Sequence, residues 1–378
     1  MKPIYLDYNA TTPVDQKVAE AMLPFLTEHF GNPSSSHILG RTTKKAIENA
    51  RIQIAEVLHC SAEEILFTSG GSESNNWAIK GVAFANSGKG NHIITSQIEH
   101  PAVIEVCHYL ESNGFKITYL AVDEFGIINP QSVINAITNQ TILISIMHVN
   151  NEVGSIQPIR EISKIARQNN ILMHSDCAQS IGKIPVFVND LDVDLLSVAG
   201  HKLYAPKGIG ALYIKSGVKL EKLIHGASQE SNYRSGTENI LGIVGLGKAF
   251  ELINGNMKKS TAHLKRLRDR LENRLIEIFP SARINGHKER RLPNTSSICF
   301  KGIEANAILE ELGDKVAVSA GAACHSHSVK ISSVLEAMKV PMEYAMGTIR
   351  FSVGRFTKEE DIDKAIIEIK NIILKLSK

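Results

Sequence analysis

The stretch Asp194-Leu-Leu-Ser-Val-Ala-Gly-His-Lys202, followed by Leu203-Tyr-Ala-Pro-Lys-Gly-Ile-Gly-Ala-Leu-Tyr213, decides how this chain is organised. An apolar run ends in glycine, histidine and lysine, and a Pro/Gly turn leads into a second apolar run, so Lys202 is expected at a strand end. A lysine confined in a pocket can hold an aldehyde cofactor as a Schiff base, whereas a free lysine amine is a poor nucleophile at neutral pH. A surface position is the ordinary alternative, and it suits the neighbouring Lys207 better.

Strands and helices alternate upstream of this stretch. We expect strands at residues 64–68, 92–96, 116–122, 141–149 and 171–175, and helices at 13–29, 42–58, 77–85, 101–111, 130–138 and 159–168. Repeated strand–helix units predict an α/β fold with a mostly parallel sheet and helices on both faces. Ligands of such sheets gather at the carboxyl ends of the strands. The polar residues that follow strand ends are Ser72, His100, Asn151, Asp176 and Lys202.

The pattern changes near residue 241, where two long helical segments extend to residue 275. The remainder is predicted to be a small α+β lobe, with strands at 294–300, 316–320 and 348–353 and helices at 304–312, 332–338 and 358–376. We therefore expect a large domain at residues 14–255 and a smaller domain that combines residues 1–13 with 256–378.

Composition excludes several classes of protein. The chain has 378 residues, of which 43% are hydrophobic and 21% charged, as in ordinary globular proteins. A net charge of +3 without a basic stripe argues against a nucleic-acid partner. We expect a cytoplasmic protein with no membrane partner, because the sequence shows neither a signal-peptide pattern nor about twenty consecutive apolar residues. Scattered cysteines without a CxxC pair argue against a disulfide framework and a zinc site; they are Cys60, Cys107, Cys177, Cys299 and Cys324.

Three features of the predicted sheet edge suggest cofactor chemistry. The loop Ser69-Gly-Gly-Ser-Glu-Ser-Asn-Asn76, between a strand and a helix, lets backbone N–H groups converge on a phosphate, although a tight turn explains it equally well. Asp176 is suited to hold a proton on a heterocyclic nitrogen, or else to cap the next helix. His100 is suited to stack on a ring and move protons, or else simply precedes a helix. Together with Lys202 these features favour pyridoxal 5'-phosphate (PLP) as the cofactor.

Two residues of the C-terminal half are candidates for substrate chemistry. Cys324 lies among small residues in an expected mobile loop, and the flanking His325 and His327 favour its thiolate. Three ligands within four residues suit a tetrahedral metal site poorly. Arg350 alternates with apolar residues on a predicted strand and is suited to clamp a carboxylate. A structural ion pair is the alternative for Arg350, and Arg355 is the competing choice.

The order and spacing of nine motifs resemble those of the NifS/IscS-type cysteine desulfurases, which are PLP enzymes of the class V aminotransferase group with the type I fold. The resemblance runs almost from end to end. The motifs are Tyr5-Leu-Asp-Tyr-Asn-Ala-Thr-Thr-Pro13, Gly31-Asn-Pro-Ser-Ser-Ser-His37, Phe67-Thr-Ser-Gly-Gly-Ser-Glu-Ser-Asn-Asn76, Glu99-His-Pro-Ala-Val103, Met147-His-Val-Asn-Asn-Glu-Val-Gly154, His174-Ser-Asp-Cys-Ala-Gln-Ser180, Gly200-His-Lys202, Arg234-Ser-Gly-Thr-Glu-Asn239 and the strand around Arg350.

The resemblance assigns cofactor roles to matching positions. It implies that Lys202 carries PLP as a Schiff base and shuttles protons, that His100 stacks on the ring, that Asp176 pairs with the pyridine nitrogen and that Gln179 contacts the ring hydroxyl. Thr237 is expected to reach the phosphate from a partner subunit, which implies a homodimer. The other expected cofactor-binding residues are Gly71, Ser72, Asn151 and His201.

The resemblance also implies the reaction. Asn151 and Arg350 are expected to hold the carboxylate of L-cysteine, while Cys324 attacks the substrate sulfur and becomes a persulfide as L-alanine is released. The persulfide sulfur then passes to an acceptor or scaffold protein, for iron–sulfur clusters, tRNA thiolation or selenoprotein synthesis.

Departures from the family pattern keep other activities open. Ala199 stands where desulfurases usually have a phosphate-binding serine, Cys177 where alanine is common, and Gly226-Ala-Ser-Gln-Glu230 replaces a glycine run. The active loop Gly321-Ala-Ala-Cys-His-Ser326 is similar to that of selenocysteine lyases, which release selenium from L-selenocysteine with alanine as co-product, as is Asn232-Tyr-Arg234. A PLP aminotransferase that uses no thiol and a non-catalytic relative are the remaining alternatives.

Overall fold

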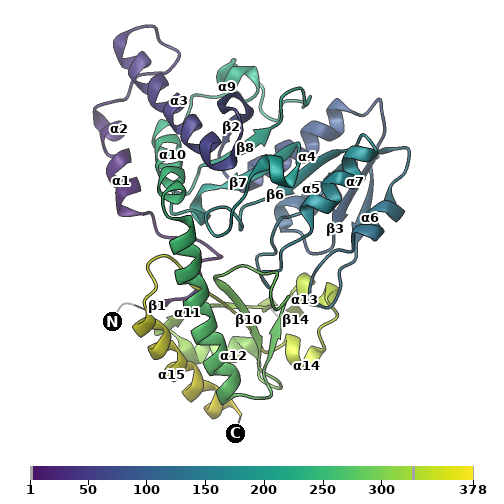
Figure 1. The fold of residues 1–378 in the computed structure, drawn as a ribbon, viewed down its shortest axis with the longest axis vertical. Helices are drawn as coiled ribbons and strands as arrows, with labels where there is room; N and C mark the ends of the chain where they lie inside the picture. Colours follow the sequence, from purple (N-terminus) through teal and green to yellow (C-terminus); the bar gives the residue numbers. More distant parts are fainter. Residues whose placement is uncertain (1–2, 326–327, 378) are drawn as a thin grey trace.

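A seven-stranded sheet forms the centre of the larger half of the molecule (Figure 1). The computed structural model describes residues 3–325 and 328–377, with no side chain described between 322 and 330. Strand β8 is antiparallel to both of its neighbours, and the other adjacent strands are parallel, as the sequence predicts. In spatial order the strands are β2 (Ile65–Thr68), β8 (Gly210–Ile214), β7 (Leu195–Ala199), β6 (Leu172–Asp176), β5 (Thr141–Ser145), β3 (His92–Ser96) and β4 (Lys116–Leu120).

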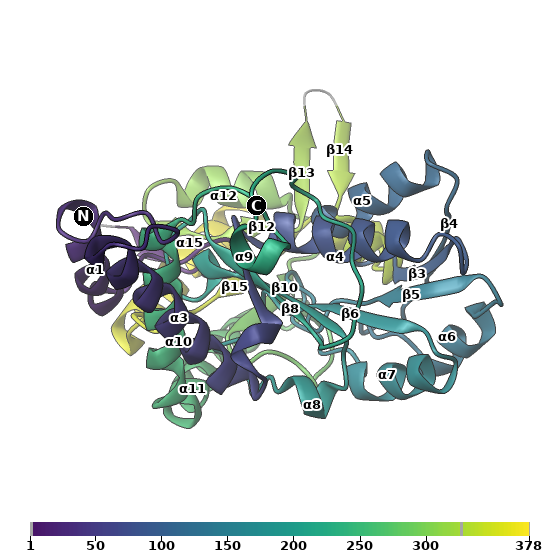
Figure 2. The same ribbon diagram turned by 90° about the horizontal axis from the view of Figure 1, so that it is seen from above.

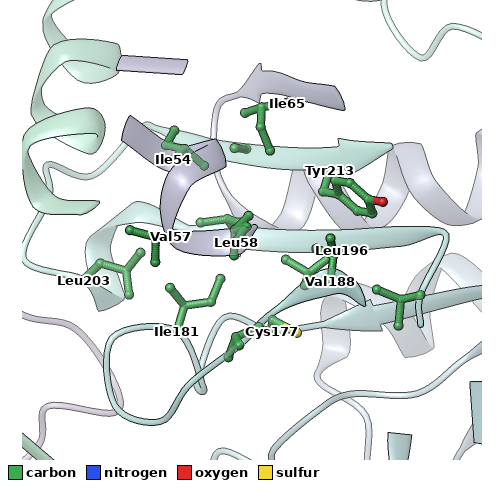
Figure 3. Close-up of a cluster of buried hydrophobic side chains, with 14 of the residues drawn as sticks. Ile54, Val57, Leu58, Ile65, Cys177, Ile181, Val188, Leu196, Leu203 and Tyr213 are labelled. Atoms are coloured by element: carbon green, nitrogen blue, oxygen red, sulfur yellow. The ribbon is translucent and has the colours of Figure 1, made fainter. Parts of the chain in front are cut away.

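Both faces of this sheet are covered because the strands are apolar on both sides. Adjacent residues of one strand enter different hydrophobic clusters: Leu66 packs with α4 (Gly71–Ala85) and α5 (Pro101–Glu111), whereas Ile65 packs with the opposite helices. Those opposite helices are α3 (Ile38–Leu58), α7 (Ile159–Gln168) and α10 (Ile240–Asn254). Figure 3 shows part of this second cluster, in which Leu58 of α3 meets Leu196 and Tyr213 of the sheet.

Several helices differ from the predicted boundaries. The helix expected at 13–29 is two helices, α1 (Gln16–Met22) and α2 (Pro24–Thr27), because Pro24 has no N–H to continue the ladder. Helix α4 begins at Gly71 instead of residue 77, so Ser72 lies in its first turn. The helices α6 (Pro130–Ala136), α8 (Val188–Leu191) and α9 (Gln229–Asn232) complete this half. None of the helices in the described ranges is long and apolar enough to cross a bilayer.

The second half has its own sheet and core. Its antiparallel sheet has the order β12 (Ser319–Ala320), β15 (Thr348–Ser352), β10 (Thr295–Cys299) and β9 (Arg283–Asn285), of which β9 was not predicted. Leu6 joins this core, since β1 (Ile4–Tyr5) pairs with β11 (Val316–Ala317). The helices that share the core are α11 (Met257–Ile278), α12 (Ala305–Leu312) and α15 (Glu359–Leu376). The domain boundaries after residues 13 and 255 stay a prediction.

The segment expected as a mobile loop contains a hairpin. Strands β13 (Ala322–His325) and β14 (Ser328–Ile331) pair antiparallel, with Cys324 opposite Val329, and project from the body of the molecule (Figure 2). The short helices α13 (Ser333–Ala337) and α14 (Met342–Ala345) follow. The backbone of Cys324 therefore lies on a strand, whereas its side chain, that of His325 and all of His327 lie outside what the structure describes.

Candidate active site

The carboxyl ends of the central strands surround a cavity of about 410 Å³. A larger cavity of about 700 Å³, between α1 and α11, has only the competing candidate Arg355 among the predicted residues in its described wall. The smaller cavity is the candidate active site, because eight predicted residues line it. They are Gly71, Ser72, His100, Asn151, Asp176, Gln179, His201 and Lys202.

Lys202 ends a short 3-10 turn, η2 (Gly200–Lys202), that directly follows β7. A Cβ at Gly200 would lie 2.8 Å from the carbonyl oxygen of Ile209, so this close approach of two chain segments requires glycine. The Lys202 Nζ donates to the carbonyl oxygen of Asn9 at 2.5 Å. Burial and the positive charge of Arg350 lower the pKa of Lys202 to about 8, against an opposing effect of Asp176. A neutral amine, the reactive form, is therefore accessible near neutral pH.

Asp176 is the last residue of β6 and is almost fully buried. Its Oδ1 accepts from the backbone N–H of Ala178 at 2.9 Å, and its Oδ2 accepts from Asn75 Nδ2 at 2.7 Å. Asn75 is on α4, and its own Oδ1 has no hydrogen-bond partner among the described residues. Two fixed donors hold this carboxylate in one orientation toward the cavity, which suits a partner for a protonated ring nitrogen.

The first turn of α4 presents its backbone to the same cavity. Gly70, with φ of 151°, is the N-cap, and no side chain caps the helix. The N–H groups of Gly71 and Ser72 have no partner among the described residues, so they are available to an anion. Ala199 packs against Gly71, because a Cβ atom added at Gly71 would lie 3.1 Å from the Cβ of Ala199.

His201 and His100 line the cavity with lowered pKa values. Burial and neighbouring positive charge, that of Lys202 foremost, lower the pKa of His201 to about 4, so its ring is neutral. Burial also lowers the pKa of His100. The His100 Nδ1 accepts from the N–H of Ala102 at 3.1 Å, so it caps α5 and faces the cavity at once. In the neutral ring the proton must then lie on Nε2.

A buried carboxyl group lies beside His100. Glu99 accepts from Ser96 Oγ at 2.6 Å and from the N–H of Met147 at 3.0 Å. Burial raises the pKa of Glu99 to about 8, with a smaller contribution from the charge of Asp176. At neutral pH its carboxyl is therefore largely protonated.

Arg350 forms a structural ion pair, which was the alternative to substrate binding that the sequence allowed. Its Nη2 donates to Asp7 Oδ1 at 2.8 Å and to Ser319 Oγ at 2.9 Å, and its Nη1 donates to the carbonyl oxygen of Asn151 at 3.2 Å. The buried Nε has no partner among the described residues. Asn151 lines the cavity and Arg350 adjoins it through this bond, so the two lie together as predicted; binding of substrate carboxylate stays a prediction.

Three other residues that the sequence singled out lie away from the cavity wall. The competing candidate Arg355 pairs with Asp15 at 2.9 Å. Thr237 is exposed and does not line the cavity of its own chain. Cys177 is fully buried in the hydrophobic cluster of Figure 3, where burial raises the pKa of its thiol to about 12. Cys177 is a core residue and makes no part of the cavity wall.

Some residues that contact the predicted site were given no role from sequence. Asn75 and Glu99 stand inside the motifs quoted above, but the motifs do not state what each side chain touches. Asn9 holds Lys202 and also accepts from Gln179 Nε2 at 3.0 Å. Lys183 donates to Gln179 Oε1 at 2.7 Å, and its only signal in the sequence is its position four residues after Gln179.

The donors and acceptors of this cavity fit PLP. An uncapped helix end suits its phosphate, an oriented carboxylate its ring nitrogen, and an amine of lowered pKa its aldehyde. These groups come from β6, α4 and the turn after β7, which are separated by up to about 130 positions of sequence. They meet because the strands that precede them end at one edge of the sheet.

Comparisons with known proteins agree with this geometry. The family model described as aminotransferase class-V matches residues 4–365. A protein of Dictyoglomus turgidum named cysteine desulfurase IscS is 52% identical over 99% of this chain and 95% of its own length. One of the same name from Methanosarcina thermophila is 50% identical, over 99% of this chain and 93% of its own. A solved NifS-like protein has a TM-score of 0.94 at 39% identity, with both chains fully covered.

Proposed function

The chain belongs to the class-V aminotransferase family, and from that premise we propose that it is a PLP-dependent cysteine desulfurase that forms a persulfide on Cys324. Relatives named cysteine desulfurase match nearly the whole chain at about half identity, which favours this activity over selenocysteine lyase. The observation that carries the proposal is the single cavity that joins the Lys202 amine, the Asp176 carboxylate and the uncapped end of α4.

The residues that would hold PLP each supply one function. When bound, PLP withdraws electrons from the substrate Cα. Asp176, held by two donors, would keep the ring nitrogen protonated, and the N–H groups of Gly71 and Ser72 would receive the phosphate. Lys202 would take the proton from Cα and return it, since its pKa of about 8 leaves a useful fraction of neutral amine. His100 carries a second exchangeable proton at the cavity wall.

Substrate binding would use the positive charge beside the cavity. Arg350 is oriented by Asp7 and Ser319, which leaves its planar guanidinium fixed, with Nε unpaired. A substrate carboxylate would add to this network or displace Asp7 from it, with the Asn151 side chain as the second donor. Both residues adjoin the cavity, so the carboxylate would anchor the substrate with its amino group toward Lys202.

The sulfur transfer balances without any oxidant. The Cys324 thiolate attacks the substrate sulfur, forming an S–S bond as the Cβ–S bond breaks. The electron pair of the broken bond stays on carbon and is captured as a C–H bond, which yields L-alanine. One enzyme thiol and one L-cysteine thus become one enzyme persulfide and one L-alanine. An acceptor protein, whose identity the proposal leaves open, would then take the outer sulfur from Cys324 by exchange.

We propose a homodimer in which Thr237 reaches the partner's cavity. Thr237 is exposed and lies outside its own cavity. An apolar surface suitable for association is provided by residues 23–38, where four large side chains are more than half exposed. They are Leu23, Leu26, Phe30 and Ile38. A cytoplasmic location is part of the same proposal and rests on the four cysteines with described side chains, which are scattered and unpaired.

Alanine formation from L-cysteine and from L-selenocysteine tests the function, with the wild type and Cys324→Ala compared. The proposal expects turnover of cysteine in the wild type and its loss in the variant. Unchanged activity of Cys324→Ala with a keto-acid acceptor would instead identify an aminotransferase. Strong preference for selenocysteine would identify the lyase, and a purified protein without a yellow cofactor band would favour the non-catalytic alternative.

Mixed subunits test the dimer. Lys202→Ala and Thr237→Ala are each expected to be impaired alone, whereas a mixed dimer contains one site with both residues intact if Thr237 acts across the interface. Recovered activity on mixing supports the proposal. If the mixed dimer stays inactive and light scattering verifies that it forms, Thr237 does not act at the partner's site.

A further inference from the structure

Lys183 is a buried lysine without an acidic partner. It is 7% exposed, and none of the described carboxylates lies within 4.0 Å of its Nζ. Burial lowers its pKa well below the usual value, and the charges of Lys202 and Arg350 lower it further. A buried lysine without an acidic partner is unfavourable for folding in its charged form, so a role at the adjacent site explains it better than a structural role.

The two hydrogen bonds of Lys183 end on residues of the cavity. Its Nζ donates to Gln179 Oε1 at 2.7 Å and to Asn9 Oδ1 at 3.1 Å. Both bonds place a side-chain oxygen opposite the Lys183 amine, so the carboxamide of Gln179 directs its Oε1 toward Lys183. The Gln179 Nε2 then donates to the backbone oxygen of Asn9 at 3.0 Å, and its second N–H has no partner among the described residues.

Asn9 extends the same control to Lys202. Its side-chain oxygen accepts from Lys183 and from Asn294 Nδ2, at 3.1 and 3.0 Å. Its backbone oxygen accepts from Lys202 Nζ, and Asn9 is only 1% exposed. The position of Asn9, and through it the acceptor of the Lys202 amine, is therefore fixed in part by Lys183.

We propose that Lys183 is a positioning residue that fixes the orientation of the Gln179 carboxamide, so that an N–H of Gln179 faces the cavity as a donor to an oxyanion of the bound cofactor. The proposal rests on the proposed function for the identity of that oxyanion, the ring oxygen of PLP. In the flipped orientation, the carbonyl of Gln179 would face the oxyanion and repel it, and the Lys183 amine would lose Oε1 as its hydrogen-bond acceptor.

The juxtaposition itself is tested on the apoprotein, so this test does not depend on the proposed function. In Gln179→Glu the introduced carboxylate is expected to pair with Lys183, and the Tm should stay within about 2 °C of the wild type. In Gln179→Glu combined with Lys183→Met, the buried carboxylate loses its partner, and the Tm should fall by about 5 °C or more. An equal fall in both variants overturns the proposal.

The orientation is tested on the holoenzyme by PLP affinity and by the pH titration of its visible absorption band. Lys183→Met is expected to weaken PLP binding by about fivefold to tenfold and to shift the titration. Lys183→Arg keeps a donor, and the small cavity of about 20 Å³ beside Lys183 gives it room, so both readouts should return toward the wild type. Lys164→Met, an exposed lysine on α7, is the matched control.

A double-mutant cycle of Lys183 and Gln179, with PLP affinity as the readout, separates a positioning role from general structural damage. In a Gln179→Ala background there is no carboxamide to orient, so Lys183→Met should lose clearly less affinity than it does in the wild type, and what loss remains reports on its bond to Asn9. The proposal is overturned if the two substitutions lower PLP affinity additively. It is also overturned if the Lys183→Met holoenzyme has the PLP affinity and the absorption titration of the wild type. A wild-type protein that binds no PLP would instead refute the proposed function and leave the apoprotein test standing.

Discussion

The buried ion pair between Arg51 and Glu230 gives a prediction whose size follows from geometry. The Arg51 Nη1 and Nη2 each donate to one Glu230 oxygen at 2.9 Å, and the N–H of Phe67 donates to the same carboxylate at 2.8 Å. The two side chains are 9% and 4% exposed. Burial by itself would lower the pKa of Arg51, but the bonds and charge of Glu230 raise it. The pair ties the segment before Thr237 to α3 and β2.

Replacing the carboxylate by an amide should be severe. In Glu230→Gln one oxygen becomes an NH₂ group that faces a donor, and the buried Arg51 charge keeps only the half-exposed carboxylate of Glu48, 3.3 Å from its Nε, as a described counter-ion. Breaking a buried pair in this way typically costs about 3–5 kcal/mol. The control Glu251→Gln, on α10, removes a carboxylate that is 47% exposed and pairs with Lys248 at the surface. Its effect should stay below about 1 kcal/mol.

Urea unfolding of the apoproteins measures the difference. The single tryptophan, Trp77, is buried under the main sheet, so its fluorescence reports on the half of the molecule that contains the pair. The double variant Arg51→Met/Glu230→Leu should recover part of the loss, because it removes both charges. If Glu230→Gln unfolds within about 1 kcal/mol of the wild type, the ion pair does not stabilise this half and the reasoning is wrong.

Three further predictions concern the site. Asn75→Leu removes one of two donors to Asp176 and should weaken PLP binding by about tenfold, whereas Asn76→Leu, next to it on α4, should not; equal dissociation constants would refute the role of Asn75. Folding lowers the Lys202 pKa from about 10.5 to about 8. This shift reduces the free energy of unfolding of the apoprotein below pH 8, and the reduction disappears as the pH rises toward 10.5. Lys202→Met should accordingly be more stable than the wild type at pH 7, by up to about 3 kcal/mol, and the advantage should shrink by pH 10 in paired unfolding curves. Cys177→Ala should keep the cofactor spectrum and turnover and lose about 1 kcal/mol of stability; loss of PLP would place Cys177 at the site.

Element identity was predictable where local pattern and burial agree. The strand at residues 92–96 and the helices at 101–111 and 159–168 match the structure at both ends, because apolar runs bounded by turn residues or proline leave little choice. The start of α4 was missed, since glycine and serine after a strand are typical of a loop and only the folded chain shows that the helix begins at Gly71. The hairpin around Cys324 was missed because pairing across a turn depends on partners, and a run of small residues has no strand pattern.

The sequence predicted the family, the α/β class, the cofactor and eight residues that line one cavity, because chemistry such as a Schiff-base lysine requires particular side chains at strand ends. Tertiary structure decided what each of those side chains touches. Arg350 meets Asp7 across 343 positions of sequence, and Asn9 meets Lys183 across 174. Such contacts depend on how the N-terminal segment packs between the two sheets, and no local pattern records this packing. Hydrogen-bond direction and pKa follow from burial and neighbours, so only the folded chain assigns them.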